Sequence, residues 1–403
     1  MGARRGAQQY LAVHSLASIK SAARDRSPIS GLTHCFYRYP ARFSPNFVAS
    51  AIEAFSSPCD AVLDPYMGGG TAIVEAIARG RQAVGCDVNS LAVFVARVKT
   101  TPLAYSEQVA VRRWTETTSQ LMYHTNREEA AELICEDRTR NLGLPRARPA
   151  KKLLAQAMLA LRDLPGERPR AFARCVLLNV AQWALNNRKN SPSLSEIRAK
   201  VTTTTEDMLS GLEAFSRQCA RPEVDGLCPV LIHGSAEFLP SIEPFATGRK
   251  ARLVLTSPPY PGIHILYHRW QIDGRRETPA PYWIADCLDS KGSSFYNFAD
   301  RRKIDCDDYF VESLRTLESI RSVVTDDAWM VQLIAFSNPR NQLRRYLRNM
   351  ELAGFREVRT ARVGDRQQRF RRIWRGVPGR AWYANLKGQT TSSREVVLIH
   401  RAA

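Results

Sequence analysis

The sequence lacks several features that would assign it to a membrane, secreted or zinc-stabilised class. No apolar run in its 403 residues approaches the ~20 that a membrane-spanning helix needs. Its nine cysteines are scattered, with no Cys-x-x-Cys pair and no Cys/His cluster at zinc spacing. We therefore expect a cytoplasmic protein with reduced thiols, no bound metal and no membrane contact.

Acidic residues are also scarce. The chain has 39 Asp and Glu against 58 Lys and Arg, which gives a formal net charge of +19. Such a surplus favours a polyanionic partner, because each phosphate neutralised by Lys or Arg releases condensed counterions. Residues 1–30 are rich in Arg, Ala and Ser, and Asp25 is their only acid. This composition is typical of a flexible basic arm, although an organellar transit peptide has a similar one.

Two stretches of the chain alternate short apolar segments with helical periodicity. From 61 to 98 the order is strand, glycine-rich loop, helix, strand and helix. The same alternation resumes near 231 and continues to a last strand at 395–399. This pattern favours parallel βαβ units in a doubly wound α/β sheet.

A helical region is predicted between these stretches. Apolar residues recur there at spacings of three and four, and the expected helices are 106–131, 151–164 and 168–187. We predict an inserted helical subdomain that serves target recognition or partner binding. The expected divisions are the basic arm (1–30), the first part of the sheet domain (31–104), the insertion (105–227) and the second part of the sheet domain (228–403).

A glycine-rich loop follows the first predicted strand. It reads Asp-Pro-Tyr-Met-Gly-Gly-Gly-Thr over 64–71, directly before a helix. Glycines at such a turn let the backbone bend sharply and let a ligand approach without meeting a Cβ. The next strand ends in Asp87, from which a carboxylate can accept hydrogen bonds from the two hydroxyls of a ribose. Asp87 could instead serve as the N-cap of the following helix.

A second motif, Thr-Ser-Pro-Pro-Tyr over 256–260, follows another predicted strand. Two consecutive prolines fix φ and remove two backbone donors, which leaves their carbonyls free as acceptors. Acceptors at the carboxyl edge of a parallel sheet can take the protons of an amino group and free its lone pair for attack on a methyl sulfonium. Tyr260 would stack on the base that carries this amine.

These motifs resemble those of the amino-methylating DNA methyltransferases. The loop at 64–71 is similar to their motif I, and 256–260 to their motif IV, where Ser before Pro-Pro-Tyr is typical of cytosine-N4 enzymes. Residues 34–45 resemble motif X, and 233–236 fall where motif III is expected, with Ser235 in place of the usual acid. The motifs follow the order X, I, II, III, IV.

The resemblance implies a Rossmann-like class I fold with a mostly parallel, seven-stranded sheet, and S-adenosylmethionine as the cofactor. The catalytic residues that it implies are Ser257, Pro258, Pro259 and Tyr260. The cofactor-binding residues that it implies are Tyr39, Phe43, Asp64, Pro65, Tyr66, Met67, Gly68, Gly70, Thr71, Asp87, Val88, Ser235 and Ala236.

Three segments compete for contact with the nucleic acid: the helical insertion, residues 261–302, and residues 366–387, where basic and aromatic side chains alternate. Arginine with aromatics suits phosphate contact combined with stacking. The candidate nucleic-acid-binding residues are His268, Arg269, Arg275, Arg276, Arg369, Arg371, Arg372, Trp374 and Arg375. His264 and His268 have a spacing that could bind metal on a helix, but no third ligand is nearby and methyl transfer requires none.

The sequence thus predicts a nucleoid-associated, site-specific DNA methyltransferase that modifies cytosine N4 by base flipping. A cognate restriction or defence protein is a possible partner. The alternatives are adenine N6 in DNA, a base amine in RNA, and a non-catalytic subunit of a defence complex that binds cofactor and DNA. The carbon-5 mechanism is disfavoured, because no Pro-Cys stands at the Pro258-Pro259 position.

Overall fold

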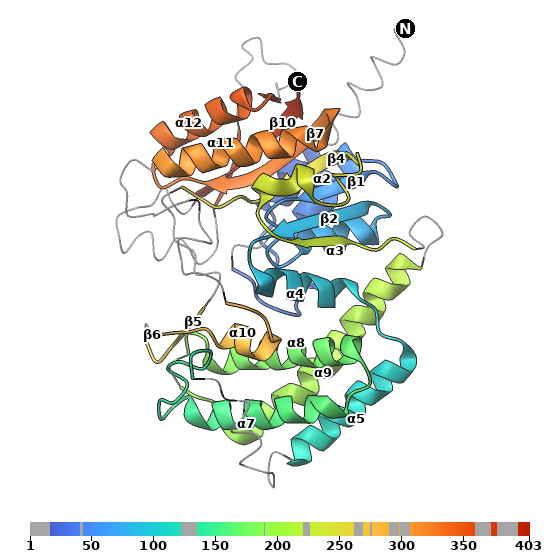
Figure 1. Ribbon diagram of the computed structural model, residues 1–403, viewed down its shortest axis with the longest axis vertical. Coiled ribbons are helices and arrows are strands. Elements are labelled where there is room, and N and C mark those ends of the chain that lie inside the picture. The colour runs from blue at the N-terminus through green and yellow to red at the C-terminus, as the bar shows by residue number, and fades with distance from the viewer. Residues whose placement is uncertain are drawn as a thin grey trace.

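The computed structural model comprises an α/β unit and a helical unit that lie one above the other (Figure 1). It describes residues 17–40, 43–121, 134, 136–188, 190–220, 226–261, 269–274, 276–289, 298, 307–358, 372–376 and 394–403. No helix within these ranges is long and apolar enough to cross a membrane.

The α/β unit is built on one twisted sheet with the order β3-β2-β1-β4-β7-β10-β8, with β9 also paired to β10. Its strands are β1 (Ala61–Asp64), β2 (Gln82–Asp87), β3 (Val230–His233), β4 (Ala251–Thr256), β7 (Val324–Ala335), β8 (Phe355–Glu357), β9 (Ile373–Gly376) and β10 (Arg394–Ala402). In the order of the sheet, the strands from β3 to β7 pair in parallel. β10 runs antiparallel to its neighbours.

Two short strands share one edge of this sheet. β9 pairs with the start of β10, at 394–397, and β8 pairs with its end, at 400–402. The eight strands therefore fill seven positions across the sheet. The expectation of a mostly parallel, Rossmann-like sheet is confirmed.

Apolar helices cover both faces of the sheet because the central strands are buried on both sides. α2 (Pro45–Phe55) and α3 (Thr71–Ala78) pack on one face, in a cluster with β1, β4, β7 and β10. α11 (Asp307–Ser322) and α12 (Pro339–Leu352) pack on the other. α4 (Ser90–Thr100) joins the sheet to the helical unit, since its apolar residues contribute to the cores of both.

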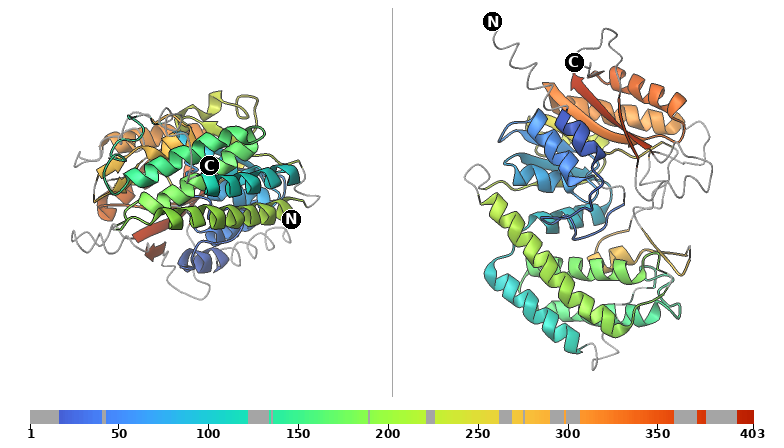
Figure 2. Two further views of the ribbon diagram at one scale, coloured as in Figure 1. Left: turned by 90° about the horizontal axis from the view of Figure 1, so that it is seen from below. Right: turned by 180° about the vertical axis from the view of Figure 1, so that it is seen from behind.

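The helical unit contains α5 (Tyr105–Leu121), α7 (Arg148–Leu159), the short 3₁₀ helix η1 (Ala160–Asp163), α8 (Glu167–Leu185) and α9 (Leu194–Cys219). Figure 2 shows the long helices α5 and α9 side by side. A second chain segment packs on α8: the hairpin β5 (Trp270–Ile272) and β6 (Arg276–Thr278), with the short helix α10 (Ala280–Ala285). The segment that follows the Pro-Pro-Tyr motif therefore joins the core of the helical unit.

The expectation of a flexible arm over 1–30 is wrong for residues 17–24. These residues are helical, and Ile19 and Ala23 are buried in the core cluster that also holds α2 and α3. Their apolar side chains fill a hydrophobic surface, so burial outweighs the basic composition of the surrounding segment.

Candidate functional site

The candidate site lies at the carboxyl ends of β1, β2 and β4, where ligands bind in open α/β sheets. Asp64, Asp87 and Thr256 are the last residues of these three strands. The Thr256 hydroxyl donates to Asp64 Oδ1 at 2.7 Å, and both side chains are buried. This hydrogen bond joins the start of the glycine-rich loop to the Ser-Pro-Pro-Tyr turn, so the two sequence motifs lie side by side at the carboxyl edge of the sheet.

Backbone hydrogen bonds fix the shape of the glycine-rich loop. The Gly68 N–H donates to Asp87 Oδ2 at 2.8 Å, and the Asn89 N–H donates to Asp87 Oδ1 at 2.8 Å. The Met67 N–H donates to the Cys86 carbonyl at 3.0 Å, which ties the loop to β2. The Asn89 side chain, and not that of Asp87, caps α4 by accepting from the Leu91 N–H. Asp87 therefore orients the cofactor loop and does not serve as a helix cap.

The glycines of the loop admit side chains of the protein itself. Gly70 has φ +72°, and a Cβ there would lie 2.9 Å from the Ala96 Cβ. A Cβ on Gly69 would lie 2.9 Å from the Tyr39 Cβ, because Tyr39 packs over the loop. The space above these two glycines, which sequence analysis expected a ligand to use, is thus partly filled by Tyr39 and α4.

Sequence analysis missed a buried polar chain around Tyr39. The Asn89 amide donates to the Tyr39 hydroxyl at 3.0 Å, and the Tyr282 hydroxyl donates to Asn89 Oδ1 at 2.9 Å. Lys99 Nζ donates to the Gly69 carbonyl at 2.6 Å. These contacts fasten the helical unit, the motif X segment and the loop together. The position of Asn89, two residues after Asp87, could have indicated a role at the site. Nothing in the sequence indicated that Lys99 or Tyr282 contacts the loop segment.

The two strand-end carboxylates have raised pKa values. Burial raises the pKa of Asp64 to about 7, against the hydrogen bond from Thr256 that lowers it. Burial also raises the pKa of Asp87 to about 6, partly offset by the N–H donors of Asn89 and Gly68. Neither carboxylate forms an ion pair among the described residues. A cationic ligand with hydroxyl donors therefore suits this pair, and S-adenosylmethionine, a sulfonium with a ribose, fits these requirements.

The remaining cofactor candidates lie around the same strand ends or beneath them. Ser235 caps the 3₁₀ helix η2 (Ala236–Ser241) by accepting from the Glu237 N–H, and the Val88 carbonyl lies 3.3 Å from His233 Nε2. Pro65, Met67 and Thr71 are buried in the loop. Phe43 is buried against Phe47 of α2 in the core, at a ring distance of 6.0 Å.

The Ser-Pro-Pro-Tyr turn is held by three hydroxyl groups. The Ser257 and Tyr260 hydroxyls are 2.8 Å apart, and the Tyr260 hydroxyl donates to Glu395 Oε1 at 2.9 Å. The Tyr309 hydroxyl donates to the Pro259 carbonyl at 2.7 Å. Tyr260 is only 5% exposed and belongs to the apolar cluster beneath α11 and α12. The ring is therefore largely covered in this structure, and its stacking on a target base stays a prediction.

The candidate nucleic-acid-binding residues that are described already have partners. Arg269 pairs with Asp289 at 2.7 Å, Arg276 with Asp273 at 3.6 Å, Arg372 with Glu357 at 2.6 Å and Arg375 with Glu395 at 2.8 Å. The Arg394 guanidinium lies over the Trp374 ring, 5.6 Å from its centroid. Residues 373–376 form β9 at the edge of the sheet, so this part of the predicted basic excursion is a paired strand. His264, His268, Arg275, Arg369 and Arg371 lie outside the described residues.

Part of the chain is similar in sequence to known DNA methylases. The DNA methylase model N6_N4_Mtase matches residues 9–96. The Type II methyltransferase M.MvaI of Kocuria varians is 35% identical over 79 residues, which is 19% of this chain and 17% of that protein. The aligned stretch is thus under a fifth of the length of this curated relative.

Two solved structures were also aligned with the chain. TrmN from Thermus thermophilus aligns over 90% of this chain and 49% of its own length, with 10% identity and a TM-score of 0.34. The rRNA methyltransferase aviRa from Streptomyces viridochromogenes aligns over 94% and 95%, with 11% identity and a TM-score of 0.33.

The sequence matches cover the glycine-rich loop, the Asp87 strand end and the Tyr39 segment. Over residues 9–96 the chain is thus similar to DNA methylases.

Proposed function

We propose that the protein is a site-specific DNA methyltransferase that transfers a methyl group from S-adenosylmethionine to the N4 amine of cytosine. The observation that carries this proposal is the 2.7 Å hydrogen bond between Thr256 and Asp64. It places the turn that would receive an amine next to the loop that would hold a methyl donor. The serine before Pro-Pro-Tyr, typical of cytosine-N4 enzymes, favours cytosine over adenine.

Asp64 and Asp87 would hold the cofactor. Asp87, fixed by the N–H groups of Gly68 and Asn89, retains lone pairs that can accept hydrogen bonds from ribose hydroxyls. When bound, S-adenosylmethionine supplies an electrophilic methyl group beside its positive sulfonium. Burial raises the pKa values of both aspartates because it disfavours their ionised forms. A cation bound beside them would favour the ionised forms again.

The Ser-Pro-Pro-Tyr turn would receive the target amine. The Ser257 hydroxyl and the carbonyls of Ser257 and Pro258 remain as acceptors, whereas Tyr309 already donates to the Pro259 carbonyl. Ser257 and Pro259 are half-buried, so part of the turn remains accessible to a ligand. Tyr260 supports the turn from beneath through its hydrogen bonds to Ser257 and Glu395.

A base in duplex DNA must leave the stack to reach this crevice, at a cost of ~a few kcal/mol. The excess of 19 positive charges over the chain supports binding to the phosphate backbone. We extend the proposal to a helical insertion at 105–227 that takes part in target recognition, and to a restriction or defence protein as partner.

The test is a methylation assay read by mass spectrometry of nucleosides. Purified protein is incubated with S-adenosylmethionine and unmethylated genomic DNA, and in parallel with total RNA. N4-methylcytosine in DNA is the expected product, and the Asp87→Ala variant provides the background. N6-methyladenine, or methylation of RNA alone, would overturn the assignment of the substrate. No methylation of either, with cofactor binding intact, would favour a non-catalytic binding subunit.

A further inference from the structure

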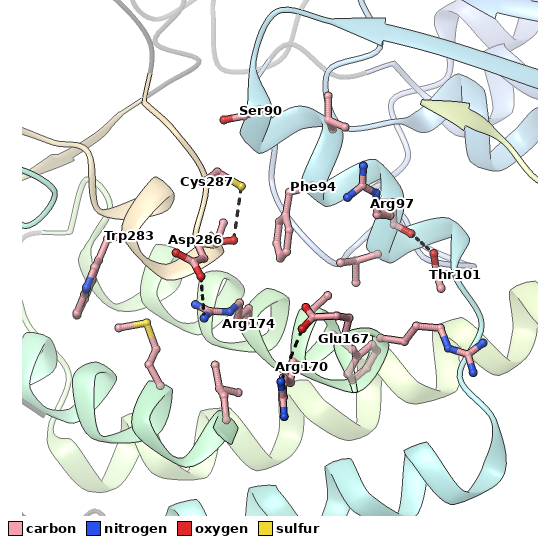
Figure 3. A pocket seen from close by; sticks show the side chains of 18 of the residues that line it. Ser90, Phe94, Arg97, Thr101, Glu167, Arg170, Arg174, Trp283, Asp286 and Cys287 are labelled. Atoms are coloured by element: carbon pink, nitrogen blue, oxygen red, sulfur yellow. Dashed lines mark hydrogen bonds and ion pairs between the residues drawn. The ribbon is translucent and has the colours of Figure 1, made fainter. Parts of the chain in front are cut away.

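A cleft separates the α/β unit from the helical unit along α4. It has a volume of about 1060 Å³ (Figure 3). One wall is a single face of α4, with residues at helical spacing such as Phe94, Arg97 and Thr101. The opposite wall is η1 and the first turns of α8, and the end of α10 closes one side. The cleft is therefore built by both units and by the segment that follows the Pro-Pro-Tyr motif.

Positive charge dominates the lining of this cleft. Six arginines face two carboxylates among the lining residues. The arginines are Arg97, Arg138, Arg162, Arg168, Arg170 and Arg174. A concave surface with one sign of charge concentrates its field and raises the local concentration of an oppositely charged ligand.

Both carboxylates form ion pairs with arginines of the cleft. Asp286 pairs with Arg174 at 3.1 Å and with Arg138 at 3.7 Å, and Glu167 pairs with Arg170 at 3.6 Å. Arg97 and Arg162 are exposed and have no carboxylate partner within the described part of the chain. These two guanidinium groups, one on each wall, are therefore available for an anion from outside.

The cleft reaches the candidate cofactor site at one end. His233 and Ser90 line it, and His233 lies beside Asp87 in the pairing of β2 and β3. The Ser90 hydroxyl donates to the Leu288 carbonyl at 2.7 Å, which joins the start of α4 to the segment after α10 at this end of the cleft. A ligand in the cleft would thus lie next to the strand ends at which methyl transfer is proposed.

We infer that this cleft binds the phosphodiester backbone of a DNA strand alongside the methylation site. Arginine binds phosphate oxygens in a bidentate manner, and half-buried Phe94, which projects toward α8 in Figure 3, offers a ring for base contact. The volume is that of a small-molecule pocket, ~300–1,000 Å³, and so admits a few nucleotides of one strand. The inference rests on the proposed function, since it takes DNA as the substrate.

The experiment compares two double variants of the full chain with equal loss of charge. Arg97→Ala/Arg162→Ala removes the two available cleft arginines. Arg217→Ala/Arg356→Ala removes two exposed arginines that do not line the cleft. Binding of a labelled 20-nucleotide DNA, single-stranded and duplex, is measured by fluorescence anisotropy over a range of salt concentrations. Melting temperature and the Kd for S-adenosylmethionine are measured beside it.

The cleft variant is expected to weaken DNA binding at least tenfold at low salt. Its slope of log K against log salt should be shallower by about 1.4 to 1.8, as two lost phosphate contacts require. The control variant should keep the slope of the wild type, and both should keep the wild-type Kd for S-adenosylmethionine. An unchanged slope in the cleft variant, or an equal loss in the control, would overturn the inference.

The two proposals fail in different ways. If the wild type methylates DNA but the cleft variant binds DNA with an unchanged slope, the function stands and the cleft assignment is wrong. If the wild type methylates no nucleic acid, the methylation assay rejects the proposed function whatever the cleft variant does. The single variants Arg97→Ala and Arg162→Ala should each give about half of the change in slope. A change in slope with only one of them would contradict a DNA strand that contacts both walls of the cleft.

Discussion

The Tyr260 hydroxyl donates a 2.9 Å hydrogen bond to the carboxylate of Glu395, which joins the Ser-Pro-Pro-Tyr turn to β10. Glu395 is 3% exposed, and its second oxygen accepts from Arg375 of β9 at 2.8 Å. A buried carboxylate is stable only where it is paired and hydrogen-bonded. The last strands of the chain thus hold the turn at which methyl transfer is proposed, although they lie outside the segment matched by the family comparison.

Replacing Glu395 by Gln should slow methyl transfer more than it weakens cofactor binding. The amide keeps an oxygen for Tyr260 but removes the charge that pairs with Arg375, so the turn loses its fixed position. We expect a loss of roughly tenfold in kcat, equivalent to ~1.4 kcal/mol, with the Kd for S-adenosylmethionine within about twofold of the wild type. Single-turnover kinetics and cofactor titration give the two values.

Arg375→Met is the matched control for this prediction. It removes the ion pair but leaves the hydrogen bond between Tyr260 and Glu395 available. If it reproduces the kcat of Glu395→Gln, the ion pair positions the turn. If Glu395→Gln lowers only the melting temperature and not kcat, Glu395 stabilises the fold without positioning Tyr260.

Gly70→Ala should destabilise the protein more than an alanine at another left-handed glycine. Both Gly70 (φ +72°) and Gly226 (φ +76°) have a backbone that disfavours a side chain. A Cβ at Gly226 would meet nothing within 4 Å, whereas one at Gly70 would meet the Ala96 Cβ at 2.9 Å and its Cα at 3.2 Å. We expect Gly226→Ala to cost about 1 kcal/mol and Gly70→Ala ~1–3 kcal/mol more, measured by urea unfolding. Equal losses would mean that α4 moves away freely.

Cofactor affinity should fall on acidification through the raised pKa of Asp87. With a pKa of about 6, Asp87 is ionised at pH 8 and protonated at pH 5. The protonated form lacks the charge that favours a sulfonium, so the Kd for S-adenosylmethionine should rise by up to about tenfold per pH unit below 6. Isothermal titration at pH 5 to 8 measures this change.

Two asparagine variants distinguish the contribution of Asp87 to the pH dependence of cofactor binding from that of Asp64. Asp87→Asn should bind the cofactor more weakly at pH 8 and lose the dependence near pH 6, so that only the dependence near pH 7 contributed by Asp64 remains. Asp64→Asn should retain the dependence near pH 6, because Asp87 still titrates. A wild-type Kd that does not change between pH 8 and 5 would contradict a direct role for Asp87.

The α/β unit could be predicted from sequence because its signals are local. β1 and β2 are short apolar runs that end in an acid, and the glycine-rich loop follows β1 directly. The helix α9 was missed, although it has 26 residues. Its run of threonines at 202–205 has low helix propensity, and packing on α5 and α8 overrides this preference. The capping box of Ser193 and Glu196 was the signal that could have located its start.

The contacts that shape the site could not be predicted, because they join residues far apart in sequence. Tyr260 meets Glu395 across 135 positions, and the pattern before Pro-Pro-Tyr gives no indication that the ring is buried. An isolated acid in the apolar segment 395–399 was the one available hint. The cleft along α4 depends on how α8 is placed against it, and the periodicity of either helix shows an apolar face but not its partner.

A buried histidine in β10, between β7 and β8, should make stability depend on pH. His400 is 1% exposed, and neither ring nitrogen has a hydrogen-bond partner. Burial lowers the pKa of His400 to about 4, although Glu357 nearby raises it. His400 is therefore protonated below about pH 6.5 in the unfolded chain, but only below about pH 4 in the folded chain. Stability is fully present above pH 6.5 and is lost as the pH falls toward 4, by up to ~3 kcal/mol.

Replacing His400 by Leu should remove this dependence. The variant has a similar volume and no unpaired ring nitrogens, so it should be more stable than the wild type at pH 5 and differ less at pH 8. Urea unfolding at half-unit steps from pH 4.5 to 8 gives the difference in unfolding free energy, which should grow as the pH falls. A constant difference between His400→Leu and the wild type would mean that His400 has the same pKa in the folded and the unfolded chain.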